Sequence, residues 1–159
     1  MLFSCSKKED FFYDEDSEIR LLNGIDLSQT KVYKEADFLL NQWAFSYKVV
    51  KPNLIVFKTT NYRKNGYYFN NTIEIHTDNE NQLIEVMAHE FGHHLESQRF
   101  YQIQNKQSEI FADNIAKNLI GLDKMTLYYT LFENRHVNEN HPSNEKRLKY
   151  LLKTDIYVP

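Results

Sequence analysis

The sequence predicts an α+β domain in which a small antiparallel sheet precedes a group of helices. Two segments, residues 53–60 and 67–77, are rich in β-branched and aromatic residues, as strands are. From about residue 81 onward, apolar residues recur at intervals of three or four, which is the spacing of helices that bury one face. Because the strand patterns are grouped ahead of these helices and do not alternate with them, the order argues against βαβ units.

Length, composition and charge limit the class of protein. The chain has 159 residues, of which 42% are hydrophobic, so it is long enough for one domain with a buried core. We assign residues 1–27 to an N-terminal tail and residues 28–159 to the domain. The net charge of −3, without a block of lysine or arginine, excludes the usual pattern of a nucleic-acid-binding protein. No apolar run approaches the roughly 18 residues that a membrane-spanning helix needs.

Helices are predicted from apolar periodicity together with capping signals. Thr77 and Glu80 have the spacing of a capping box, Ser108 is a favoured helix cap, and Gly121 is typical of a helix end. The expected helices run from Ser28 or Thr30 to before Pro52, from Asn81 to Gln98, from Ser108 to Ile120, from Asp123 to Asn134, and from Pro142 onward.

The two strand-like segments are expected to form a hairpin. Asn65 and Gly66 lie between residues 53–60 and residues 67–77, and Asn-Gly is the dipeptide most typical of a tight hairpin turn. We therefore expect the two segments to pair in an antiparallel sheet.

The segment Val86–Glu96, VMAHEFGHHLE, contains the pattern H-E-x-x-H. His89 and His93 are one turn apart on one face of the predicted helix, so both imidazoles can bind one metal ion. Glu90 lies about 100° round the helix from His89, so its carboxylate flanks the ion, where a general base is needed, without ligating it. Because the chain has one cysteine, any metal must be held by nitrogen and oxygen atoms.

A third ligand is expected on the next helix. Zinc that is held by two histidines at a catalytic site usually takes a third protein ligand. Glu109 and Asp113 lie four residues apart, so Glu109 can ligate the ion while Asp113 points at the same site. Asp113 can then accept a hydrogen bond from the ring N–H of a ligating histidine. The alternative is an ordinary solvated helix face, but the position directly after H-E-x-x-H favours one zinc ion per chain.

These residues resemble a family of zinc metallopeptidases that includes the CAAX prenyl proteases and the HtpX membrane proteases. The similarity extends from about residue 54 to the C-terminus. It is carried by H-E-x-x-H at 89–93, by Glu109-x-x-Ala112-Asp113, and by His141-Pro142 followed by Arg147 and Leu148. Members such as HtpX have membrane-spanning helices, which this sequence does not predict, so the chain resembles a soluble or lipoprotein branch.

The resemblance implies a zincin-like fold and a role for each residue of the motif. It places zinc on His89, His93 and Glu109 and makes Glu90 the general base. The His-Pro segment and its arginine lie near the cleft in this family, so His141 and Arg147 become candidates for stabilising an oxyanion.

The stretch Leu2–Asp10, LFSCSKKED, resembles the cleavage box of bacterial lipoproteins. That resemblance implies a lipid anchor through Cys5 and a location in the bacterial cell envelope. Only four residues precede Cys5, so the basic and apolar regions of a signal peptide are missing. The alternative is a free thiol in an N-terminal tail, with a cytoplasmic location.

Other residues receive more ordinary interpretations. His94 faces about 100° away from the ligand face and is expected to be a surface or packing residue. His76, on the second predicted strand, is expected to be exposed. Tyr128 and Tyr129 are expected in the core, although one hydroxyl could reach the cleft. Gly92 costs about 1 kcal/mol in mid-helix relative to alanine, so we expect another backbone to approach it closely.

The function predicted from these features is that of a zinc-dependent endopeptidase acting on peptides or unfolded proteins. An extended substrate is expected to pair with an edge strand around Thr72–Thr77, because main-chain pairing makes few demands on substrate sequence. Two alternatives remain open: a cytosolic peptidase of the ImmA/IrrE type that cleaves regulators, and a non-catalytic envelope module braced by zinc. The sequence gives no indication of oligomeric state.

Overall fold

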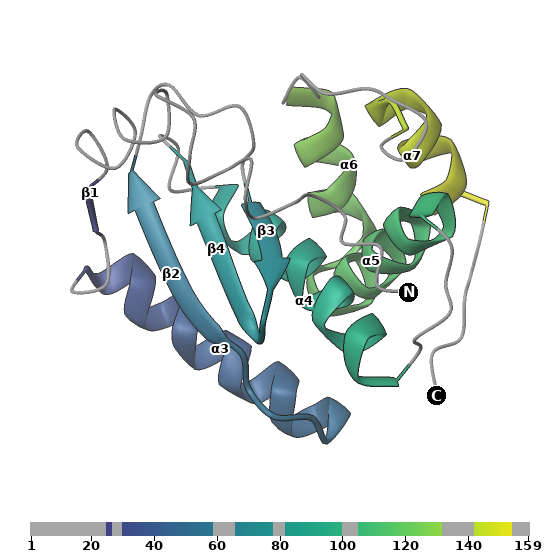
Figure 1. The fold of residues 1–159 in the computed structure, drawn as a ribbon. Coiled ribbons are helices and arrows are strands. Elements are labelled where there is room, and N and C mark those ends of the chain that lie inside the picture. Colours follow the sequence, from purple (N-terminus) through teal and green to yellow (C-terminus); the bar gives the residue numbers. More distant parts are fainter. Residues whose placement is uncertain are drawn as a thin grey trace, which may run out of the picture.

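The structure is a computed structural model, which describes residues 25–26, 30–58, 66–77, 82–99, 105–131 and 142–153. These residues form a mixed set of helices and strands, so the predicted α+β class is confirmed (Figure 1). The elements are β1 (Ile25–Asp26), α3 (Lys31–Tyr47), β2 (Asn53–Lys58), β3 (Gly66–Phe69), β4 (Thr72–His76), α4 (Leu83–Arg99), α5 (Asn105–Ile120), α6 (Leu122–Leu131) and α7 (Asn144–Leu151). Cys5 lies outside the described residues, whereas β1 belongs to the segment that the sequence assigned to the tail.

The sheet is mixed, and the prediction of a purely antiparallel sheet was wrong. Its strand order is β1-β2-β4-β3. β2 and β4 are parallel, with Leu54 opposite Ile73 and Val56 opposite Ile75, whereas the β1–β2 and β3–β4 pairs are antiparallel. β4 therefore lies between two strands, and the predicted substrate edge at Thr72–Thr77 was wrong as well. Among the described strands, β3 occupies the edge on the side of α4 (Figure 1).

The predicted hairpin between residues 53–60 and 67–77 was wrong, because the tight turn lies inside the second of these segments. Asn70 and Asn71 have φ angles of 47° and 57° and join β3 to β4. A two-residue hairpin turn needs this left-handed conformation, and asparagine tolerates it better than most residues. Gly66 instead begins β3, where a Cβ atom would lie 2.5 Å from Cγ1 of Val86 on α4. The glycine serves the close approach of strand and helix.

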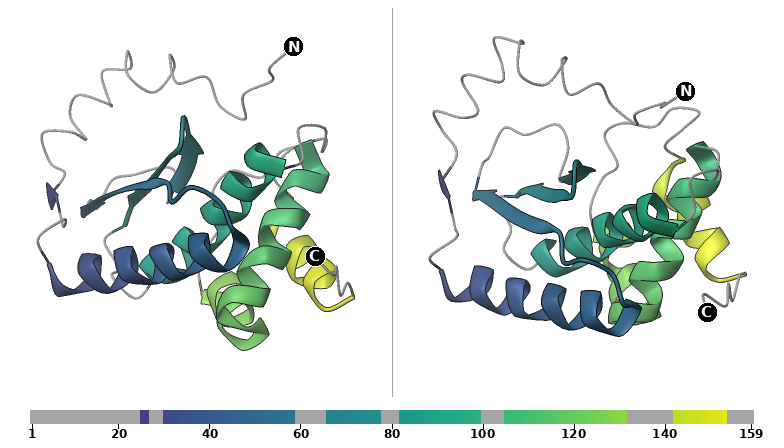
Figure 2. Two further views of the ribbon diagram at one scale, coloured as in Figure 1. Left: turned by 90° about the horizontal axis from the view of Figure 1, so that it is seen from below. Right: turned by 60° about the horizontal axis from the view of Figure 1, so that its bottom comes forward.

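One face of the sheet packs on α3 and α4 (Figure 2). The inward-facing residues alternate along β2 and β4, as they do in a half-buried strand: Leu54, Val56, Ile73 and Ile75. α3 contributes Leu40 and Trp43, and the Trp43 ring lies 5.9 Å from the Phe91 ring of α4. Thr30 caps α3 as expected, but the helix ends at Tyr47, before Pro52, because Lys48 adopts a left-handed conformation.

α4 is the element shared by the sheet and the remaining helices. It runs beside β3, and α5 crosses it closely at Gly92 (Figure 1). A Cβ atom on Gly92 would lie 2.5 Å from Cα and 2.9 Å from the carbonyl oxygen of Ala112. The predicted approach of another backbone to Gly92 is therefore confirmed.

α6 and α7 pack against α5, away from the sheet (Figure 1). Ser143 caps α7 by accepting a hydrogen bond from the backbone N–H of Lys146, so Pro142 precedes the cap and does not occupy the first turn. In the parts of the chain that are described, no helix is both long and apolar enough to cross a membrane.

Candidate metal centre

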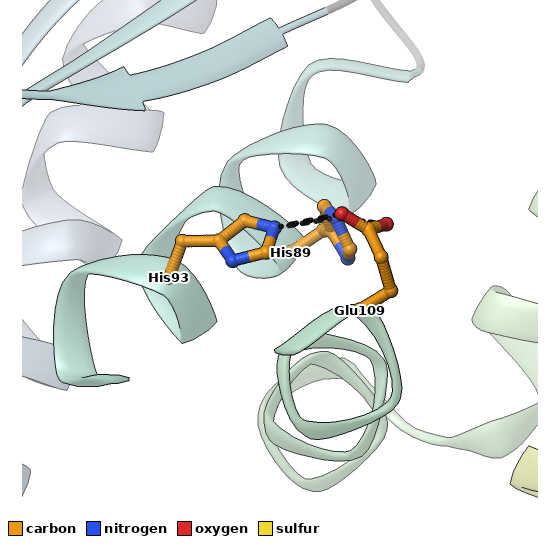
Figure 3. A group of neighbouring side chains, drawn as sticks. All are labelled: His89, His93 and Glu109. Atoms are coloured by element: carbon orange, nitrogen blue, oxygen red, sulfur yellow. Dashed lines mark hydrogen bonds and ion pairs between the residues drawn. The ribbon is translucent and has the colours of Figure 1, made fainter. Parts of the chain in front are cut away.

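Three side chains from α4 and α5 converge on one point (Figure 3). The Nε2 atoms of His89 and His93, one turn apart on α4, lie 3.2 Å from each other. Glu109 of α5 reaches both rings, with Oε2 at 3.5 Å from Nε2 of His89 and Oε1 at 3.4 Å from Nε2 of His93. The three candidate ligand atoms all lie within 4.8 Å of one another, so this group could hold a metal ion.

The contact between α4 and α5 explains why Glu109 arrives at this point. Gly92 and Ala112 bring the two backbones together just beside the histidines. Glu109 lies almost one turn before Ala112 on α5, so its side chain leaves the helix next to the ring of His93. The site is thus assembled by helix packing, and a bulkier residue at the crossing would move its third member.

The donor set fits zinc. Two imidazole nitrogens and one carboxylate oxygen are ligands that zinc takes at catalytic sites, and the residues leave a fourth position to another molecule. Burial would lower the pKa of His89, but its hydrogen bonds to Asp113 and Glu109 outweigh burial and raise it. For His93, hydrogen bonds to Glu109 and Glu96 likewise overcome burial and raise the pKa well above its ordinary value. Surroundings that favour a positive charge on two neighbouring rings also favour a divalent cation between them.

Asp113 makes the contact that the sequence predicts for it. Its Oδ1 lies 2.9 Å from Nδ1 of His89, which leaves Nε2 of that ring directed at Glu109. Burial would raise the pKa of Asp113, but the charge and hydrogen bonds of Arg147 lower it to about 2. Asp113 is therefore ionised at neutral pH and accepts the ring N–H of His89.

Arg147 is buried among these residues. Its Nε donates to Oδ2 of Asp113 at 2.9 Å, and its Nη2 donates to Oδ1 at 2.5 Å, so the guanidinium and the carboxylate form a bidentate pair. Nη2 also lies 3.1 Å from Nδ1 of His89, and Nη1 lies 3.5 Å from Oε2 of Glu109. These contacts favour a positioning role over the predicted contact with an oxyanion. His141 lies outside the described residues, so its role stays a prediction.

Tyr129 of α6 completes the surroundings of Asp113. Its hydroxyl donates a hydrogen bond to Oδ1 of Asp113, and its ring lies 4.8 Å from the guanidinium carbon of Arg147. Burial, followed by the nearby carboxylate, raises the pKa of Tyr129 well above its ordinary value, so the hydroxyl remains a donor. The core position expected for Tyr129 is confirmed, and its hydroxyl also supports the metal site.

Glu90 lies on another side of α4, next to the sheet. It is 6% exposed, and a Cβ atom placed on Gly66 of β3 would lie 3.3 Å from its Oε1. Its charge contributes to the raised pKa of His93. The carboxylate thus lies beside the start of the edge strand, acts on His93 through its charge, and is not one of the three converging ligands.

Two residues near His93 were not assigned to the site by sequence. Glu96 of α4 places Oε2 3.4 Å from Nδ1 of His93, and Ser108 of α5 places Oγ 3.2 Å from the same nitrogen. Ser108 was predicted to cap its helix, but α5 begins at Asn105, so Ser108 lies within the first turns and its hydroxyl faces α4. The spacing of Glu96, three residues after His93, is the one signal that could have indicated the first contact.

The remaining histidines have structural contacts. His94 is fully buried, with Nε2 2.8 Å from the carbonyl oxygen of Val50, so the packing role expected for it is confirmed. His76 was predicted to be exposed, which was wrong: it is 5% exposed, lies 5.1 Å from the Phe57 ring, and places Nε2 2.6 Å from Oε1 of Glu74. Stacking on an aromatic neighbour and pairing with a carboxylate compensate for its burial.

No protein-family model, curated protein or solved structure matches the chain. The geometry of the metal-binding group and its neighbours is therefore the basis for proposing a function.

Proposed function

We propose that the protein is a zinc-dependent endopeptidase that hydrolyses peptide bonds in protein substrates. One observation carries this proposal: two imidazole nitrogens and one carboxylate converge on a point, while a separate buried carboxylate, Glu90, lies close to them without belonging to the group. A structural metal site needs the converging ligands, with acids such as Asp113 to orient them, but it does not need a general base. Hydrolysis requires both.

The three converging residues His89, His93 and Glu109 would hold the zinc ion. Zinc supplies Lewis acidity at such a site, since it brings the pKa of water down to about 7 and polarises a carbonyl group. Glu90 accepts the proton of the attacking water on its carboxylate and afterwards delivers it to the nitrogen of the leaving amine. Asp113, paired with Arg147, holds the His89 ring so that Nε2 faces the metal position.

An extended polypeptide is the proposed substrate, and β3 takes the substrate-pairing role that was predicted for β4. β3 is one of the two edge strands of the described sheet, and it begins at Gly66, directly against Glu90. A substrate strand paired with this edge would pass beside the proposed base, because main-chain hydrogen bonds align extended peptides along a strand. We expect an unfolded or flexible segment of a protein as substrate.

The residues at the site support the resemblance to the CAAX prenyl protease and HtpX type of peptidase, and with it a zincin-like fold. H-E-x-x-H lies on α4, Glu109 and Asp113 lie on the next helix, and Arg147 reaches both of them from α7. A location in the cell envelope, through a lipid on Cys5, completes the proposal and rests on the sequence around that cysteine.

The deciding experiment compares the parent protein with the Glu90→Gln variant. The amide has nearly the volume of the acid but no basic oxygen, so we expect unchanged zinc content and a melting temperature within a few degrees. Cleavage of casein should fall by about 10²- to 10⁴-fold, the usual contribution of a general acid–base. Zinc content, thermal melting and casein cleavage are measured side by side. An active Glu90→Gln protein would refute the mechanism, and an inactive parent with a full zinc site would favour the zinc-braced binding module.

A further inference from the structure

We propose that Ser108 and Glu96 form a hydrogen-bonded relay that positions His93 as a metal ligand. The inference rests on the metal site of the proposed function and assigns to it two residues that the sequence motif does not include. Both side chains meet His93 at Nδ1, the nitrogen that faces away from Glu109.

The relay follows from the number of protons that each group carries. A serine hydroxyl has one proton to donate and lone pairs to accept with. Ser108 Oγ donates its proton to Oε2 of Glu96, so toward His93 it can only accept, at 3.2 Å from Nδ1. The direct distance from Nδ1 to Oε2 of Glu96 is longer, at 3.4 Å. In the neutral ring that a metal ion requires, the imidazole proton therefore lies on Nδ1 and points at Ser108, whose own proton points at Glu96.

This arrangement leaves the lone pair of His93 Nε2 free for a metal ion. Nε2 lies 3.4 Å from Glu109 and 3.2 Å from Nε2 of His89, inside the metal-binding group. An outer hydrogen bond of this kind fixes the ring's tautomer and orientation and makes the imidazole a stronger ligand. His93 thus receives from Ser108 and Glu96 what His89 receives directly from Asp113.

The supports of the two histidines differ in chemistry. Asp113 is paired with Arg147 and is almost fully buried, whereas the side chain of Glu96 is 15% exposed. Among the described side chains, no lysine or arginine forms an ion pair with Glu96. The hydroxyl of Ser108 therefore holds this carboxylate on one side of the His93 ring. The same hydrogen bond links α4 to α5.

A purely structural link between α4 and α5 is the competing explanation, and the two are separable. A structural link would change the stability of the metal-free protein and leave the zinc affinity of the folded state alone. A relay would change zinc affinity, and the variants should not act independently, because Ser108→Ala breaks the chain of hydrogen bonds through which the charge of Glu96, removed in Glu96→Gln, acts on His93.

The test uses the full chain with Ser108→Ala, Glu96→Gln, the double variant and Ser108→Thr. Zinc affinity is measured by competition with a chelator, and thermal melting is recorded without metal. We expect Ser108→Ala and Glu96→Gln each to weaken zinc binding by about 10- to 100-fold. The double variant should bind zinc nearly as well as whichever single variant binds it less tightly. Ser108→Thr keeps a hydroxyl and should retain most of the parent's zinc affinity. Ser97→Ala is the matched control, because that hydroxyl bonds to the backbone oxygen of His94 and to Tyr68.

The outcomes separate this inference from the proposed function. Parent-like zinc affinity in Ser108→Ala and Glu96→Gln would overturn the relay while leaving the metal site intact. Fully additive losses in the double variant would also overturn it, since two independent contacts would then act on His93. A parent protein that binds no zinc would overturn the metal site itself and the relay with it.

Discussion

The carboxylates near His89 and His93 have different roles because each has different neighbours. Glu109 faces the Nε2 atoms of both rings and is placed as a ligand. Asp113 is held by a guanidinium and a phenol, so it is fixed as an anion that orients His89. Glu90 lies against β3, close to the ligands but outside their group. The same functional group thus serves as candidate ligand, as support and as proposed base on two neighbouring helices.

At the residue scale, Arg147→Ala should destabilise the protein more than any surface ion-pair variant. Among the described side chains, removing the guanidinium leaves the buried charge of Asp113 with the Tyr129 hydroxyl and the His89 ring beside it. Breaking one partner of a buried pair in this way costs about 3–5 kcal/mol. The measurement is the free energy of unfolding in urea, on metal-free protein, so that zinc binding does not contribute.

The matched control for Arg147 is Lys31→Ala. Lys31 and Glu35 form an exposed pair one turn apart on α3, at 3.5 Å. Pairs of this kind contribute about 0.5 kcal/mol or less, because water and salt screen them. If Arg147→Ala and Lys31→Ala lowered the free energy of unfolding equally, Arg147 would not be needed to stabilise the buried charge of Asp113.

At the scale of the element, the α4–α5 crossing decides where Glu109 lies. Alanine is about 1 kcal/mol more favourable than glycine inside a helix, so Gly92→Ala would stabilise α4 if no other residue contacted that position. The new Cβ atom would instead meet Cα and the carbonyl oxygen of Ala112 at 2.5 Å and 2.9 Å, and backbone atoms cannot turn aside. We expect a lower melting temperature and weaker zinc binding together, measured by thermal melting and chelator competition.

A second substitution shows which atoms of Ala112 cause the effect. Ala112→Gly removes its Cβ atom, which is 2.9 Å from the position of the new one, but leaves Cα and the carbonyl oxygen in place. Combined with Gly92→Ala, it should therefore restore little of the zinc affinity. A full recovery would mean that side-chain crowding, and not backbone contact, sets the distance between the helices.

Helices were predicted better than strand pairing because their signals are local. The spacing of His89 and His93, or of Glu109 and Asp113, is fixed by a single turn and can be read from a short window. Strand pairing depends on segments far apart, so the Asn65-Gly66 dipeptide could not show that β2 pairs with β4 in parallel. The contributions of Ser108, Tyr129 and Arg147 likewise arise only when separate helices pack together, and their side chains carry no local sign of the partner.

At the scale of the whole molecule, the metal-binding group joins two parts of the fold. α4 packs on the sheet and α3, whereas α5 belongs to the group of helices that also contains α6 and α7. His89 and His93 come from the first part, and Glu109 comes from the second (Figure 3). An ion bound by all three would link the sheet side of the molecule to its helical side.

Zinc should therefore stabilise the entire fold and not one helix. A ligand that binds only the folded state stabilises it by about 2.7 kcal/mol when its free concentration is 100 times its Kd. We expect zinc to raise the melting temperature of the chelated parent protein in a concentration-dependent way. His93→Ala should lose the bound zinc and most of this rise, whereas a rise of equal size in that variant would place the stabilising ion elsewhere.

The position of Arg147 on α7 has a consequence for biosynthesis. Translation proceeds from the N-terminus, and α7 is the last of the described helices to leave the ribosome. Until it does, Asp113 has no guanidinium partner, and the His89 ring lacks a fixed anion to hold it. For a protein proposed to cut unfolded chains, this order is protective: the nascent polypeptide, itself an unfolded chain, has been made through α7 before the proposed site is assembled.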